Sequence, residues 1–254
     1  MRIERGTDRV LSGPLETVYV YEAPVRVWHW VMALCMVVLA ATGYLIGRPL
    51  PAIGGEAYSS YFFAMIRMLH FIAAWIFTIV FVMRIYWAIV GNHHARAIFL
   101  PPFFNRAWWR GMVQQMRYYL FMREESDLWI GHNPLAQASM FFMYTLGTFL
   151  IIITGFALFA EQWGWGTLPM RLFGWVFVLA GDASTVRTVH HLAMWYLLLF
   201  ALVHMYMVVR EDIMGGETEI GTMFSGIRMF RGRTWRDPEA PAAAEGEAIG
   251  KRTA

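Results

Sequence analysis

The sequence predicts an all-α integral membrane protein: a bundle of four transmembrane helices with short interfacial helices. Of its 254 residues, 58% are hydrophobic and only 15% are charged, whereas a soluble domain carries about a quarter charged residues. The apolar residues also gather in four runs of about 20 residues or more, enough to cross roughly 30 Å of hydrocarbon. These runs are Trp28–Gly47, Leu69–Val90, Leu135–Ala160 and Thr188–Val209.

The N-terminal arm, residues 1–27, is polar, and Thr17–Tyr21 within it is expected to be extended. The arm does not resemble a cleavable signal, because the apolar run that follows is long and lacks a small-residue cleavage site. We therefore expect the first helix to remain as a signal anchor. Residues 28–209 are expected to form a single membrane domain.

Shorter segments complete the predicted organisation. Trp108–Met122 mixes aromatic, apolar and basic residues, which favours a helix lying in the membrane interface over a loosely structured basic loop. Met170–Gly181 is apolar but too short to span, so it is expected to form a short helix on one surface. Residues 210–236 form a basic segment, and the polar tail 237–254 is expected to be disordered.

The basic residues predict the orientation in the membrane. Segments 1–27, 91–134 and 210–254 hold four, five and seven of the 21 Lys and Arg residues, whereas 47–68 and 161–187 hold two each. Basic loops remain in the cytoplasm, so we expect a multi-pass protein of a bacterial inner membrane with both termini in the cytoplasm. This topology accounts for the net charge of +3, and no nucleic-acid partner is expected.

Cys35 is the only cysteine and falls within the first apolar run. The chain therefore has no CxxCH motif for covalent haem, no cysteine pair for zinc and no ligand set for an iron–sulfur cluster.

The histidines form the most informative pattern, because ionisable groups within a membrane are costly and usually functional. His190 and His204 are 14 residues apart in the fourth run, close to four helical turns, so they face nearly the same way about 21 Å apart. His70 is expected at the outer level with His190, and His29 at the inner level with His204. The sequence thus predicts two pairs of imidazoles, one near each membrane face.

Two stacked b-haems, each held by two axial histidines, require such an arrangement, and a closed six-coordinate iron suits electron transfer. The alternative is that each histidine only anchors a helix end. His191 is a second candidate beside His190, although it is rotated by about 100° and shares its face less well with His204. His93 and His94 lie in the inner loop and are expected to be solvated.

Small and basic residues near these histidines have two open interpretations. Gly43, Gly147 and Gly155 would let a flat macrocycle approach the backbone, or would let two helices pack closely. Three arginines would pair with haem propionates, or would extend to the aqueous interface. They are Arg67, Arg84 and Arg187.

Six short segments match a known pattern: VRVWHW at 25–30, RMLHF at 67–71, GHNPLAQ at 131–137, the pair His190-His191, HMY at 204–206 and REDIM at 210–214. In these segments the chain resembles the b-type cytochrome subunits of membrane-bound nickel–iron uptake hydrogenases. The likeness covers about residues 15–230.

The resemblance implies an electron route with several partners. Hydrogen would be split by a separate nickel–iron large subunit outside the membrane, since this chain lacks the cysteines for such a centre. Electrons would reach the outer haem, on His70 and His190, from the iron–sulfur small subunit, whose C-terminal membrane helix packs against this chain. The inner haem, on His29 and His204, would pass them to quinone. The gamma subunits of formate dehydrogenases look similar, so a cytochrome subunit of that or another periplasmic oxidoreductase is the alternative.

The same resemblance places quinone near the inner haem. It makes Asn133 the expected hydrogen-bond partner of the quinone, with His132 and Gln137 as neighbours, because a carbonyl acceptor needs a donor and an amide supplies one. An Asn-Pro pair before a long apolar run is also an ordinary helix entry, and the sequence leaves both interpretations open.

Overall fold

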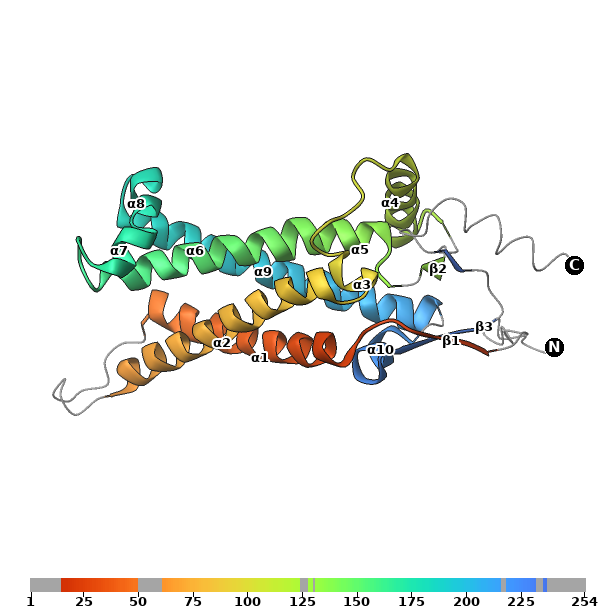
Figure 1. The fold of residues 1–254 in the computed structure, drawn as a ribbon, viewed down its shortest axis with the longest axis horizontal. Helices are drawn as coiled ribbons and strands as arrows, with labels where there is room; N and C mark the ends of the chain where they lie inside the picture. The colour runs from red at the N-terminus through yellow and green to blue at the C-terminus, as the bar shows by residue number, and fades with distance from the viewer. Residues whose placement is uncertain are drawn as a thin grey trace, which may run out of the picture. The chain divides into compact units, whose positions relative to one another are not determined.

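The computed structural model describes residues 15–49, 61–123, 128–129, 131–215, 218–231 and 235–236. The predictions for residues 1–14 and for the tail 237–254 lie outside the described residues. The elements in chain order are β1 (Leu15–Tyr19), α1 (Ala23–Gly47), α2 (Phe62–Val90), α3 (His93–Arg96), α4 (Arg106–Tyr119), β2 (Leu128–Trp129), α5 (Pro134–Ser139), η2 (Met140–Thr145), α6 (Leu146–Glu161), α7 (Leu168–Phe173), α8 (Trp175–Ala180), α9 (Ala183–Arg210), η3 (Glu211–Gly215), α10 (Glu219–Ser225), β3 (Ile227–Arg231) and β4 (Trp235–Arg236) (Figure 1).

The predicted four membrane-spanning helices are confirmed. Helices long and apolar enough to cross a bilayer cover Ala23–Gly47, Phe62–Val90, Pro134–Glu161 and Ala183–Ile213. The first, second and fourth begin several residues before the apolar runs do, since arginines such as Arg26 can continue a helix while their charged ends reach water.

The spanning helices turn most of their apolar surface outward. At most 28% of the most apolar stretch of any span is buried within the chain, and large aliphatic side chains such as Leu34, Ile72 and Leu199 are exposed. In water such an apolar surface would cause aggregation, whereas in a bilayer it contacts lipid tails. The helices form their backbone hydrogen bonds internally, as a segment in lipid must.

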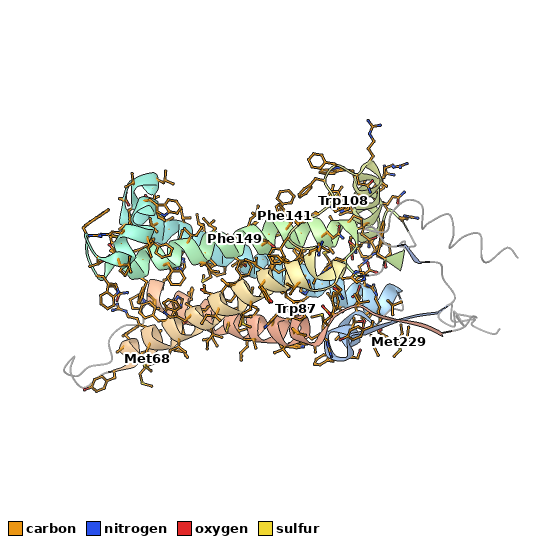
Figure 2. All side chains as sticks on the ribbon, viewed as in Figure 1. Met68, Trp87, Trp108, Phe141, Phe149 and Met229 are labelled. Carbon is orange, nitrogen blue, oxygen red and sulfur yellow. The ribbon has the colours of Figure 1, made fainter. Side chains whose placement is uncertain are left out.

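The chain divides into two compact units, and each is described by itself. The membrane unit comprises residues 24–101 and 137–205. Its core includes Met32, Cys35, Phe77 and Phe81, so the lone cysteine is a buried apolar residue. Phe149, labelled in Figure 2, meets Phe81 edge-on with 5.1 Å between ring centroids.

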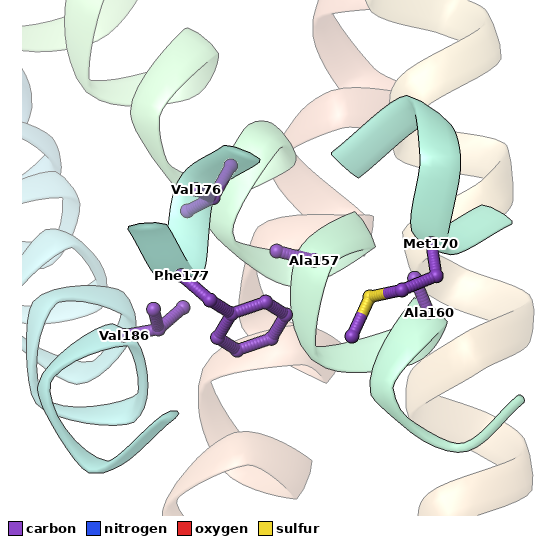
Figure 3. Packing of buried hydrophobic residues seen from close by; sticks show 6 residues of the cluster. All are labelled: Ala157, Ala160, Met170, Val176, Phe177 and Val186. Atoms are coloured by element: carbon purple, nitrogen blue, oxygen red, sulfur yellow. The ribbon is translucent and has the colours of Figure 1, made fainter. Parts of the chain in front are cut away.

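A single short helix was expected over Met170–Gly181, but the structure has two, α7 and α8, which meet at Gly174. Both lie beside one end of α6. Figure 3 shows how their apolar side chains fill this end of the membrane unit, against two alanines of α6 and a valine of α9. The members of this cluster are Ala157, Ala160, Met170, Val176, Phe177 and Val186.

Two features of the membrane unit differ from expectation or were not predicted. His94 was expected to be solvated but is buried. It lies in the short helix α3, which is held against α2 because Arg84 donates to the Ala95 carbonyl at 2.6 Å. His93 was also expected to be solvated, but its side chain lies outside the described part. The third span contains the π-helical segment η2, a distortion that often accompanies functional sites.

The second unit comprises residues 1–23, 102–136 and 206–254. The helix predicted over Trp108–Met122 is present as α4, and its buried residues Trp108, Gly111, Gln115 and Tyr118 recur every three or four positions. That spacing marks an amphipathic helix with one covered face. Asn105 caps its start by accepting from the backbone N–H of Ala107 at 2.8 Å.

A small antiparallel ribbon also belongs to this unit. β1 overlaps the segment expected to be extended and pairs with β3, from Leu15 opposite Arg231 to Tyr19 opposite Ile227. Arg228 in β3 is buried, forms an ion pair with Glu219, and donates to the Gly131 carbonyl at 2.8 Å. The partner strand was not predicted, because such pairing depends on contacts distant in the sequence.

Candidate functional site

The two histidines expected at the inner level come together in the membrane unit. His29 near the start of α1 and His204 near the end of α9 have ring centroids 6.3 Å apart. The His204 ring stacks on Phe200, one turn earlier in α9, at an interplanar angle of 15°. The position of His204 in α9 therefore sets the direction of its side chain, and stacking on Phe200 fixes the plane of the imidazole ring.

The two histidines expected at the outer level, His70 in α2 and His190 in α9, also lie close enough to interact electrostatically. Nδ1 of His70 is 2.8 Å from the Thr42 hydroxyl, and Nδ1 of His190 is 2.9 Å from the Thr154 hydroxyl. Four helices thus meet at this level, two providing a histidine and two providing a threonine.

The threonine contacts determine which histidine nitrogen carries hydrogen. The Thr42 and Thr154 hydroxyls each lie 2.7 Å from the backbone carbonyl four residues earlier, of Val38 and Leu150. A hydroxyl has one hydrogen, so each donates it to that carbonyl and accepts from Nδ1–H of its histidine. Nε2 is then left with a lone pair for a metal, the usual arrangement of a histidine ligand and its outer partner.

Glycines make room for both outer rings. A Cβ atom at Gly43 would lie 3.3 Å from Cε1 of His70, and one at Gly155 would lie 3.1 Å from Cε1 of His190. At Gly147 the nearest atoms belong to Leu197 instead. The sequence left two roles open for these glycines, approach of a macrocycle to the backbone or close helix packing. In the structure Gly43 and Gly155 lie against histidine rings, and Gly147 lies against Leu197 of a neighbouring helix.

His191 lies against a different helix. Its ring packs on the backbone of Gly47 in α1, where no side chain would fit, and it interacts electrostatically with both His70 and His190. His191 therefore borders the outer pair without sharing the threonine contact of His190.

The histidine geometry fits bis-histidine haem. An iron bound to two imidazole nitrogens at about 2.0 Å on each side places the ring centroids roughly 6 Å apart, close to the 6.3 Å between His29 and His204. Among the described residues no group of three or more His, Cys, Asp or Glu could hold a metal ion. Bound haem would supply one-electron transfer.

The three arginines considered for propionate contacts differ in their surroundings. Arg84 is buried, donates to the Ala95 carbonyl and lies over the Phe99 ring at 5.4 Å. Arg187 forms an exposed ion pair of 2.7 Å with Glu161, and Arg67 is exposed. Of these three arginines, Arg84 is therefore the one that is buried within the membrane unit.

Asn133 lies in the other unit and caps the third span. Its Oδ1 accepts from the backbone N–H of Ala136 at 2.8 Å, so the helix-entry interpretation is confirmed. The Asn133 side chain also bonds the hydroxyl of Tyr119. Of the expected neighbours, His132 meets the Tyr21 hydroxyl at 3.3 Å and Gln137 is buried.

A buried polar network surrounds Tyr119 in this unit. Its hydroxyl donates to Oε1 of Glu211 at 2.6 Å, and the Gln115 amide donates to the same oxygen at 2.7 Å. Burial, followed by the negative charge of Glu211, raises the pKa of Tyr119 above its usual range. Sequence reasoning missed Tyr119 and Glu211; the only signal was a carboxylate within REDIM, next to an apolar helix.

The sequence matches a family already described. The sequence profile of the family called prokaryotic cytochrome b561 matches residues 20–226. The chain belongs to this family. A b561-family cytochrome carries b-type haem, and this member crosses the membrane with several helices.

Proteins similar to this cytochrome carry a consistent name. A protein of Azotobacter vinelandii, named "Probable Ni/Fe-hydrogenase B-type cytochrome subunit", is 50% identical over 229 residues, 90% of this chain and 95% of that protein. A Cupriavidus necator protein of the same name is 47% identical, covering 89% of this chain and 94% of its own. An Escherichia coli K12 protein, named "Probable Ni/Fe-hydrogenase 1 B-type cytochrome subunit", is 45% identical, covering 90% and 96%. The family resemblance expected from the sequence is confirmed.

Proposed function

We propose that this cytochrome holds two b-haems and transfers electrons from the small subunit of a periplasmic nickel–iron hydrogenase to the quinone pool. The observation that carries the proposal is the paired arrangement of histidines, His29 with His204 and His70 with His190, in a chain 45–50% identical to proteins named as hydrogenase cytochromes. These names favour the hydrogenase over the alternative, a formate dehydrogenase or another periplasmic oxidoreductase.

The four histidines act as axial ligands in this proposal. His70 and His190 hold the outer haem, which accepts electrons from the small subunit, whose C-terminal helix packs against this chain. His29 and His204 hold the inner haem, close to quinone. The excess of Lys and Arg in segments 1–27, 91–134 and 210–254 supports both termini being cytoplasmic in a bacterial inner membrane.

Histidine substitution tests the ligand assignment. The full-length chain, purified in detergent, gives a dithionite-reduced minus oxidised spectrum and a pyridine haemochrome value, for which we expect two b-haems. His70→Ala or His190→Ala should remove one haem and leave the other, and His29→Ala or His204→Ala should do the reverse. His191→Ala is the matched control and should keep both haems. Two haems surviving any of the four ligand substitutions would contradict the pairing.

Asn133 is proposed to donate a hydrogen bond to a quinone carbonyl. The Oδ1 atom is used by the helix cap, so the amide nitrogen is the group available for the ligand. Asn133→Asp and Asn133→Ser keep a capping oxygen but remove the amide donor. We expect both variants to slow hydrogen-to-quinone turnover of the complex with both haems retained.

The capping variants distinguish the two roles of Asn133. If Asn133 only begins the helix, the Asp and Ser variants should turn over normally while Asn133→Ala loses about 1 kcal/mol of stability. Normal turnover in Asp, Ser and Ala variants alike would refute the quinone contact.

A further inference from the structure

Thr42 and Thr154 occupy equivalent places beside the outer histidine pair. Each precedes a glycine and an aromatic residue, in ATGY at 41–44 and ITGF at 153–156. Each accepts a hydrogen bond from a histidine on another helix, while the adjacent glycine receives the same ring. One Thr-Gly pair from α1 and one from α6 therefore hold His70 and His190 from two sides.

The donor direction has an electronic consequence for the ligand. A hydroxyl that already donates to a carbonyl at 2.7 Å is polarised and becomes a better acceptor. Nδ1–H donation to that oxygen raises electron density on Nε2, which makes the imidazole a more basic ligand.

In the inner pair, at least one histidine differs from the outer histidines in the hydrogen bonding of its Nδ1 atom. Nδ1 of His29 is buried, and no group within the part of the chain that the structure describes forms a hydrogen bond with it. Two sites built from the same ligand type thus differ in the partners of those ligands, which is a recognised way of tuning haem potential.

We propose that Thr42 and Thr154 are positioning residues that keep the outer histidines in the Nε2-ligating tautomer and make the outer haem the harder of the two to reduce. More basic ligands stabilise ferric iron over ferrous iron, so the midpoint potential of the outer haem lies below that of the inner haem. Electron transfer from the outer to the inner site is then downhill, and only an electron moves, with no bond or proton to balance. The proposal rests on the two-haem function proposed above.

Removing each hydroxyl tests the proposal. Valine is close to threonine in shape but cannot accept from Nδ1–H, so Thr42→Val and Thr154→Val isolate the hydrogen bond. Thr42→Ser and Thr154→Ser keep the hydroxyl. Thr78→Val is the matched control, since the Thr78 hydroxyl donates to the Ala74 carbonyl in α2 and forms no hydrogen bond with a histidine of the described part of the chain. The readouts are a redox titration of the haem α-bands and the low-spin ferric electron paramagnetic resonance signals, both on the full-length chain.

The expected result is an upward shift of one haem's midpoint potential in each valine variant, a larger shift in the double variant, and no shift in the serine variants or in Thr78→Val. Loss of the outer haem in the valine variants alone, with serine restoring it, also supports the positioning role. Two haems with unchanged potentials in the double valine variant would refute the inference. Fewer than two haems in the unsubstituted chain would instead refute the proposed function.

Discussion

Adding one methyl group at Gly155 should displace His190, which we propose as a ligand of the outer haem. A Cβ atom there would lie 3.1 Å from Cε1 of His190, whereas carbon atoms rest at about 3.5–4.0 Å. The ring would have to retreat by roughly half an ångström, although a metal–imidazole bond of about 2.0 Å tolerates only about 0.2 Å. Overpacking of this size costs about 1–3 kcal/mol, so we expect Gly155→Ala to bind the outer haem roughly 5- to 150-fold more weakly.

Haem retention measures this effect directly. The Gly155→Ala chain is purified in detergent, and the amplitude of each b-haem is followed in reduced minus oxidised spectra during dilution or competition with apo-myoglobin. Gly147→Ala is a matched control, since its added methyl would lie equally close, at 3.1 Å, but to Leu197 and not to a histidine. It should lower thermal stability while keeping both haems. Gly43→Ala, with its contact at 3.3 Å, should be milder than Gly155→Ala.

The comparison between the two alanine variants decides the point. If Gly155→Ala keeps the outer haem as firmly as the unsubstituted chain, the ring at Gly155 is not a ligand held in that position. If Gly147→Ala loses the haem to the same extent, the effect comes from helix packing and says nothing about His190.

The polar network of the second unit gives two further predictions. Glu211→Ala should destabilise the protein by about 3 kcal/mol, because it removes the carboxylate oxygen that accepts from both the buried Gln115 amide and the Tyr119 hydroxyl. Glu211→Gln should cost less, and equal midpoints for the two variants in thermal unfolding would argue against this. The raised pKa of Tyr119 should give stability that is complete below its unfolded pKa of about 10 and is lost as pH rises toward the folded value. Unfolding midpoints between pH 8 and 11 should therefore fall less in Tyr119→Phe than in the unsubstituted chain, and parallel curves would contradict the shift.

The number and position of the spanning helices were predictable because lipid imposes a simple demand. A helix that crosses hydrocarbon must be predominantly apolar for about 20 residues, and few other constraints produce such runs. The helix starts were less predictable. α2 begins at Phe62, before Leu69. Residues such as Arg67 precede the apolar run, so the requirement for apolar side chains no longer marks the helix there.

The histidine pairs were predicted from helical phase within the fourth span and from the depth expected for His29 and His70. A separation of 14 residues in α9 places His190 and His204 on one face whatever packs against them, and His29 does approach His204. The small ribbon of β1 and β3 was beyond such reasoning, because nothing near Thr17 in sequence specifies a partner beginning at Ile227. The burial of His94 was missed for the same reason, since it depends on a contact between α2 and α3.

The Thr-Gly pairs show why an internal relationship between α1 and α6 escapes sequence inspection. Only two adjacent positions in each helix are constrained, a hydroxyl that accepts from a histidine and a glycine that leaves room for its ring. The other positions face lipid or neighbouring helices, where any apolar residue of suitable size serves. A threonine before a glycine in an apolar helix is unremarkable by itself, because threonine can satisfy its hydroxyl on its own backbone. It becomes informative only when a histidine of another helix is expected at the same depth, and both Thr42 and Thr154 meet that condition.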